Sequence, residues 1–183
     1  MTPREFIDKI AQSATDFYHD HKISAALTIA QGCFESGYGK YAPGNNVFGI
    51  KADASWHGAT ITAPTQEYVN GAYVTVQSKF RAYATLGDSL IDHGNFLLDN
   101  PRYDNLKGAP WIRAVVLIRQ DGYATDPTYS QTLKSLIQQW GLQKFDTVTK
   151  YAVEIQSFAD RDAAERVAKA VALLGYHSTL KKL

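Results

Sequence analysis

The feature that most constrains the fold is a β-hairpin signal in an otherwise helical pattern. Two runs rich in β-branched and aromatic residues, 59–69 and 72–80, flank the dipeptide Asn70-Gly71. Asn-Gly favours a tight hairpin turn because both residues tolerate positive φ. One hairpin cannot build its own core, so it must lie against the helices as a small lobe. The sequence therefore predicts two lobes with a cleft between them, the usual place for a site.

Helical periodicity fills the rest of the first 145 residues. Apolar spacing and capping residues predict five helices, at about 3–21, 24–36, 85–98, 109–119 and 127–140. Thr2-Pro3-Arg4-Glu5 has the spacing of a capping box, and Asp126 is the predicted N-cap of the last helix. We expect residues 1–145 to form one mostly helical α+β domain with a small β-hairpin lobe.

After Lys144 the pattern changes. Residues 151–158 alternate like a strand, 160–174 are periodic like a helix, and 177–183 are typical of the start of another strand. Such a short βα(β) segment, 146–183, is too small to hold a core alone. We expect it to dock on the main domain, to pair with another chain, or to be the front of a longer module.

Charge and cysteine content exclude several classes of protein. With 19 Lys+Arg against 18 Asp+Glu the net charge is +1, so no nucleic-acid or anionic membrane partner is expected. No apolar run approaches the ~18 residues that span a bilayer. The N-terminus lacks the apolar core of a signal peptide. Cys33 is the one cysteine and the five histidines are scattered, so we expect neither a metal nor an organic cofactor.

Carboxylate chemistry remains. Glu35 lies in the last turn of an apolar helix, where desolvation would raise its pKa. Hydrolysis of a glycosidic bond needs such a protonated donor, together with a second carboxylate, for which Glu67 near the hairpin turn is a candidate. On its position alone, Glu35 could equally well be a surface glutamate near a helix end, and Glu67 could be a solvated strand residue. Asp92 and His93 are candidates for a structural hydrogen-bonded pair.

Several short motifs follow one another in a characteristic order over about residues 1–142. They are Glu-Ser-Gly-Tyr-Gly at 35–39, Asn-Asn-Val-Phe-Gly-Ile-Lys at 45–51, Thr-Gln-Glu at 65–67, Phe-Arg-Ala-Tyr at 80–83, Asp-Ser-Leu-Ile-Asp-His at 88–93, Arg-Tyr at 102–103 and Gly-Tyr-Ala-Thr-Asp-Pro at 122–127. Together they resemble glycoside hydrolase family 73, the peptidoglycan N-acetylglucosaminidases related to the flagellar-rod muralytic protein. The resemblance implies a lysozyme-like α+β fold and endo-type cleavage of the β-1,4 bond between N-acetylglucosamine and N-acetylmuramic acid.

The resemblance also implies roles for individual residues. It places the general acid at Glu35, the second acidic residue at Glu67, and a residue that positions the reacting sugar at Tyr123. The implied substrate-binding residues are Tyr38, Asn46, Phe48, Trp56 and Asp126. Tyr38 stands where many relatives have Trp, and Phe48 has an alternative role in packing the lobes together. Inverting, retaining and substrate-assisted mechanisms all remain open.

The C-terminal segment 146–183 is similar to the start of a SPOR repeat, which binds glycan strands stripped of peptide. The matching pieces are residues 153–158, the helix from Asp160, and 174–176. Because the second half of a repeat is not present, the alternative is self-association through the C-terminal strand. Peptidoglycan is the expected partner in either case.

Rival functions and settings follow from the same residues. A muramidase or a lytic transglycosylase would use the same fold to cut the other glycosidic bond. A non-catalytic wall-binding module would keep only the cleft. Without a signal peptide, the chain suits a phage endolysin held in the host cytoplasm until a pore opens. It suits equally a bacterial autolysin whose leader has been removed.

Overall fold

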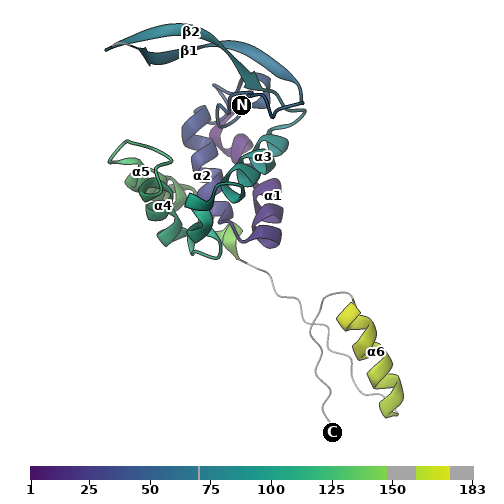
Figure 1. The fold of residues 1–183 in the computed structure, drawn as a ribbon. Coiled ribbons are helices and arrows are strands. Elements are labelled where there is room, and N and C mark those ends of the chain that lie inside the picture. Colours follow the sequence, from purple (N-terminus) through teal and green to yellow (C-terminus); the bar gives the residue numbers. More distant parts are fainter. Residues whose placement is uncertain (70, 148–159, 174–183) are drawn as a thin grey trace. The chain divides into compact units, whose positions relative to one another are not determined.

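The computed structural model of the protein describes residues 1–69, 71–147 and 160–173 (Figure 1). They fall into two units, Met1–Val148 and Thr149–Leu183. Helix α6 (Arg161–Leu173) is the described part of the second unit and matches the helix predicted there. The strands predicted at 151–158 and 177–183 lie outside the described residues. No described helix has the length and apolar character needed to cross a bilayer.

The first two helices begin at the residues that the capping signals predict. α1 (Pro3–His21) starts with a complete capping box, in which the backbone N–H of Glu5 and the side chain of Thr2 hydrogen-bond at 3.3 Å. α2 (Ala25–Ser36) has Ser24 as its N-cap, whose Oγ accepts from the backbone N–H of Leu27 at 3.0 Å. Gly37, with φ of 55°, ends α2. These local signals set the bounds of both helices.

The start of α5 (Tyr129–Trp140) differs from its prediction. Asp126 Oδ1 accepts hydrogen bonds from the backbone N–H of Thr128 at 2.7 Å and from its hydroxyl at 2.8 Å. Asp126 therefore closes a turn before the helix and is not its N-cap. The helix begins at Tyr129, two residues later than predicted.

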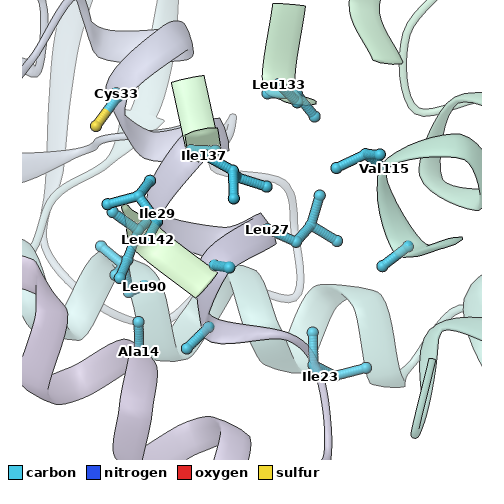
Figure 2. Packing of buried hydrophobic residues seen from close by; sticks show 14 of the residues in the cluster. Ala14, Ile23, Leu27, Ile29, Cys33, Leu90, Val115, Leu133, Ile137 and Leu142 are labelled. Carbon is cyan, nitrogen blue, oxygen red and sulfur yellow. The ribbon is translucent and has the colours of Figure 1, made fainter. Parts of the chain in front are cut away.

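The hydrophobic core is built around α2. Every residue of this helix from Ala25 to Cys33 is buried, as expected of a helix that is apolar all round. Two further helices are α3 (Leu86–Leu98) and α4 (Trp111–Gln120). Figure 2 shows side chains of α1, α3, α4 and α5 packed around Leu27 and Ile29 of α2. Burial raises the pKa of the Cys33 thiol to about 12, which makes it an inert core residue.

The far end of the first unit is tied to the start of α2. Asp146 ends a short 3-10 helix, η3 (Leu142–Asp146), and its carboxylate accepts from Ser24 Oγ at 2.7 Å and from the backbone N–H of Ala26 at 2.9 Å. A carboxylate at a helix N-terminus also favours the helix dipole. Burial raises the pKa of Asp146, and these hydrogen bonds oppose the rise.

The predicted hairpin is present. β1 (Thr60–Val69) and β2 (Ala72–Arg81) pair antiparallel, and the register runs from Thr60 opposite Arg81 to Val69 opposite Ala72. A two-residue connection at 70–71 follows from this register, as Asn-Gly predicts. Figure 1 shows the hairpin projecting from the helices of the first unit. The mostly helical α+β fold with one hairpin lobe is thus confirmed.

The root of the hairpin is fixed to α3 by a charged cluster. Arg81 Nη1 donates to both carboxylate oxygens of Asp92, at 3.0 and 2.9 Å, and the Tyr83 hydroxyl donates to the same carboxylate at 2.8 Å. The Arg81 guanidinium also lies over the Trp56 ring, 4.7 Å from its centroid. The prediction that Asp92 pairs with His93 is wrong, because neighbouring residues of a helix point in different directions.

Candidate active site

Glu35 lies in the last turn of α2, where its carboxyl group meets α5. The hydroxyl of Tyr129, the first residue of α5, donates to Glu35 Oε1 at 2.7 Å. Tyr129 is 1% exposed, whereas Glu35 keeps an exposed side chain. Burial by the surrounding protein raises the pKa of Glu35, and the hydrogen bond from Tyr129 opposes that rise without cancelling it. The result is a carboxyl group that holds its proton to higher pH than a free glutamate.

A second buried side chain fixes the direction of this hydrogen bond. Gln31, 0% exposed, donates from Nε2 to the Tyr129 hydroxyl at 3.2 Å. Because that oxygen accepts from Gln31, its own hydrogen is directed at Glu35. Glu35 Oε1 is thereby occupied as an acceptor, so Oε2 is the oxygen open to a proton when the group is protonated. The order of donation is Gln31 to Tyr129 to Glu35.

The sequence analysis did not identify Tyr129, which donates to Glu35, or Gln31, which donates to Tyr129. Gln31 had a usable signal, since a polar residue one turn before Glu35 on an apolar helix shares its face. Tyr129 had none, because its contact with Glu35 joins positions 94 residues apart.

The structure brings Tyr123 to the same place. Its ring stacks on Tyr129 with 6.0 Å between centroids and 28° between planes. Burial raises the pKa of Tyr123, and the nearby charge of Glu35 adds to the effect. The Tyr123 hydroxyl lies 3.1 Å from His93 Nε2. Phe48 stacks on a face of this histidine, at 3.8 Å and 11°, and its two candidate roles, binding substrate and packing the lobes together, both stay predictions.

Asn46 is buried at the root of the hairpin. It is 1% exposed, and its amide Nδ2 donates to the carbonyls of Ile50 and Arg81, both at 2.9 Å. Its Oδ1 accepts from the backbone N–H of Ile50 at 3.0 Å. With its hydrogen-bonding groups used by backbone, Asn46 holds the loop onto the hairpin root. Asn46 also lines the groove between this loop and the hairpin, and a role in binding substrate stays a prediction for it.

The other substrate-binding candidates make local contacts. The Tyr38 hydroxyl accepts from Trp140 Nε1 at 3.0 Å. Trp56 Nε1 donates to the carbonyl of Ala59 at 2.9 Å. Asp126 is exposed and holds the turn before α5. A role in binding substrate stays a prediction for Tyr38, Trp56 and Asp126.

Glu67 lies in β1 opposite Val74, three positions before the hairpin connection. Its backbone is thus near the end of the hairpin that lies farthest from the Arg81 root. Its part in the chemistry stays a prediction.

A groove runs between the loop that follows α2 and the hairpin. Its volume is about 590 Å³, and Tyr41, Pro43, Pro64 and Phe80 are among its lining residues. Across residues 1–69, 71–147 and 160–173, no three His, Cys, Asp or Glu side chains gather closely enough to hold a metal ion.

Known proteins resemble this chain over the same residues. The glucosaminidase family, described as mannosyl-glycoprotein endo-beta-N-acetylglucosaminidase, matches residues 11–142. The peptidoglycan hydrolase FlgJ of Salmonella typhimurium is 35% identical over 144 residues, 74% of this chain and 46% of the relative. The exo-glucosaminidase LytG of Bacillus subtilis is 30% identical over 152 residues, 78% of this chain and 53% of the relative. The chain thus spans about half the length of these curated relatives.

The structural comparison agrees with the sequence comparison. A C-terminally truncated glycoside hydrolase domain of Salmonella typhimurium FlgJ superposes with a TM-score of 0.67 and 34% identity, covering 76% of this chain and 98% of that domain. The hairpin and the ordered motifs lie within residues 11–142, which the family matches. The chain therefore belongs to the glucosaminidase family, glycoside hydrolase family 73, as its motifs predict.

Proposed function

We propose that the chain is an endo-β-N-acetylglucosaminidase that hydrolyses the β-1,4 bond between N-acetylglucosamine and N-acetylmuramic acid in peptidoglycan. Membership of the glucosaminidase family supports the reaction type. FlgJ, named a peptidoglycan hydrolase, and LytG, named a glucosaminidase, support the substrate. The observation that carries the proposal is the Glu35 carboxyl group, which has a raised pKa and a fixed donor on one oxygen.

In this proposal Glu35 is the general acid. Its Oε2 gives a proton to the glycosidic oxygen as the bond to the anomeric carbon breaks, and the sugar gains oxocarbenium character. The carboxylate left behind is stabilised by Tyr129, because a hydrogen bond to an ionised acceptor is stronger than one to a neutral group. Tyr129 thus acts more strongly on the state after proton transfer than on the state before it.

The second group of the reaction is open to a direct test. Glu67 is our candidate to orient the attacking water or to stabilise positive charge on the sugar. The alternative is that the substrate's own acetamido oxygen attacks the anomeric carbon. Under the first mechanism Glu67→Gln loses nearly as much activity as Glu35→Gln, and under the second it loses much less.

The first experiment measures clearing of purified peptidoglycan suspensions. Wild type, Glu35→Gln and Glu67→Gln are compared with Asp8→Asn, a control at an exposed carboxylate of α1. We expect the wild type and the control to clear the suspension, and Glu35→Gln to bind without clearing it. A wild type that binds but never clears would show a wall-binding module and overturn the proposal.

Product analysis then tests which bond is cut. Mass spectrometry of the released fragments should show N-acetylglucosamine at the reducing end. An anhydro-muramyl end would identify a lytic transglycosylase, and a muramic acid reducing end a muramidase. Long oligosaccharide fragments distinguish the endo activity from release of single sugars at a chain end.

The setting of the reaction is a bacterial cell wall in either predicted form, phage endolysin or bacterial autolysin. Segment 146–183 is proposed to add affinity for glycan strands. A chain ending after residue 148 tests this role, because the described core contacts and the Asp146 hydrogen bonds lie before that point. We expect weaker pelleting with peptidoglycan and unchanged hydrolysis of soluble glycan fragments.

A further inference from the structure

His93 is a buried residue that the proposed reaction has not yet used. It lies on α3 and is 1% exposed. Phe48 covers one face of its ring, and the edge of Tyr123 meets it at 81°, with 5.6 Å between centroids. Nε2 lies 3.1 Å from the Tyr123 hydroxyl oxygen. The other ring nitrogen, Nδ1, is buried without a hydrogen-bond partner among the described residues.

The unpaired nitrogen distinguishes the two neutral tautomers of His93. With the hydrogen on Nδ1, an N–H group would be buried without an acceptor, which is rare in folded proteins. With the hydrogen on Nε2, that N–H donates to Tyr123, and Nδ1 keeps only a lone pair. The charged form does not compete, because burial lowers the pKa of His93 to about 3.

The hydrogen of the Tyr123 hydroxyl must then point elsewhere. The ionised form of Glu35 raises the pKa of this phenol, so the Tyr123 hydroxyl lies beside the Glu35 carboxyl group, where a bound sugar would meet it. The arrangement repeats the one behind Tyr129, where Gln31 donates to the hydroxyl and the hydroxyl donates to Glu35. Two stacked tyrosines therefore each have a buried nitrogen donor behind them.

We propose that His93 is a positioning residue whose Nε2–H holds the Tyr123 hydroxyl as an acceptor, so that Tyr123 donates its own hydrogen toward the reacting sugar beside Glu35. This inference rests on the proposed function, because the sugar supplies the acceptor oxygen. His93 does not touch the substrate and acts through Tyr123. Its contribution is to make the Tyr123 hydroxyl oxygen accept from His93, so that the hydroxyl hydrogen is free to be donated to the sugar.

The tautomer can be read without changing the protein. The full chain is labelled with ¹⁵N-histidine, and the His93 resonances are assigned by their loss in His93→Gln. We expect a protonated, pyrrole-type Nε2 and an unprotonated, pyridine-type Nδ1 that do not change through neutral pH. A protonated Nδ1 would overturn the proposal. This result is independent of catalysis, so it stands even if the chain fails to clear peptidoglycan and the proposed function falls.

Kinetics then test whether His93 acts through Tyr123. His93→Leu removes the donor, whereas the amide Nε2 of His93→Gln can still reach the tyrosine. In the wild-type background we expect kcat to fall on the order of 10²-fold for His93→Leu, with little change in KM, and much less for His93→Gln. In a Tyr123→Phe background His93→Leu should add nothing further.

Equal losses for His93→Leu in both backgrounds would show a packing role only and would refute the proposal. Thermal unfolding of each variant separates lost activity from lost fold. If His93→Leu does not fold, His93→Gln and the tautomer measurement still decide.

Discussion

The hydrogen bond between Tyr129 and Glu35 predicts a shift in the pH dependence of hydrolysis. Tyr129→Phe keeps the ring that packs on Tyr123 and removes the hydroxyl that donates to Glu35 at 2.7 Å. That donor stabilises the ionised carboxylate, so its loss raises the pKa of Glu35 further. Because the general acid must be protonated, the alkaline limb of kcat/KM should move to higher pH.

The size of the shift follows from the kind of bond that is lost. A hydrogen bond to a charged group contributes about 1.5–3 kcal/mol, but water can replace part of it because Glu35 is exposed, so we take about 1 kcal/mol. At 1.36 kcal/mol per pH unit, the limb should move up by about 0.7. Gln31 also loses its acceptor in a site with 0% exposure. The free energy of unfolding should therefore fall by about 1–3 kcal/mol.

The assay is the initial rate of peptidoglycan clearing over the pH range in which both proteins stay folded, with urea unfolding measured in parallel. The matched control is Tyr103→Phe, a buried tyrosine that packs near Tyr123 and makes no hydrogen bond to Glu35 among the described contacts. Its alkaline limb should coincide with that of the wild type. If the limb of Tyr129→Phe stays in place or moves to lower pH, the assignment of Glu35 as the acid held by Tyr129 is wrong.

Three further predictions concern stability and are read from urea unfolding. Because the pKa of Glu35 is raised in the folded protein, the wild type loses stability as pH rises from the ordinary glutamate value of about 4.3 through the folded value. Glu35→Gln should therefore be more stable than the wild type at neutral pH and equally stable in acid. No difference at neutral pH would contradict this. Asp92→Asn breaks the ion pair with Arg81 and should cost about 2 kcal/mol, whereas an unchanged midpoint would show that the hairpin root does not depend on it. Gly94→Ala places a Cβ against the Phe17 ring, closer than two carbon atoms can approach, and should cost about 1–3 kcal/mol; an unchanged midpoint would show that the ring moves freely.

Local chemistry made the elements predictable. Thr2 and Ser24 define helix starts through hydrogen bonds to residues three positions away, and the hairpin turn depends on two adjacent residues. The start of α5 was misplaced because Asp126 satisfies a turn with the same kind of hydrogen bond that an N-cap makes. Sequence spacing alone does not separate these two uses of an aspartate.

The site was predictable only in part. Glu35 could be found because a carboxyl group at the end of an apolar helix is conspicuous. Its environment could not, because the hydrogen-bond donor Tyr129 lies 94 residues later in the chain. The hydrogen bonds of Asn46 could not be predicted for the same reason, since its partners Ile50 and Arg81 meet it only once the hairpin root is in place.

The hydrogen bonds that Asp146 accepts at the start of α2 have a consequence for biosynthesis. The start of the helix that carries Glu35 donates two hydrogen bonds, from Ser24 Oγ and the backbone N–H of Ala26, to a residue 120 positions or more later in the chain. A nascent chain that still lacks Asp146 contains α2 without the carboxylate that accepts these two hydrogen bonds. Helix α5, which begins with Tyr129, is also among the last parts of the domain to leave the ribosome. Glu35 therefore meets its hydrogen-bond donor Tyr129 only as synthesis of the domain ends, so chains cut before that point should carry Glu35 as an ordinary solvated glutamate.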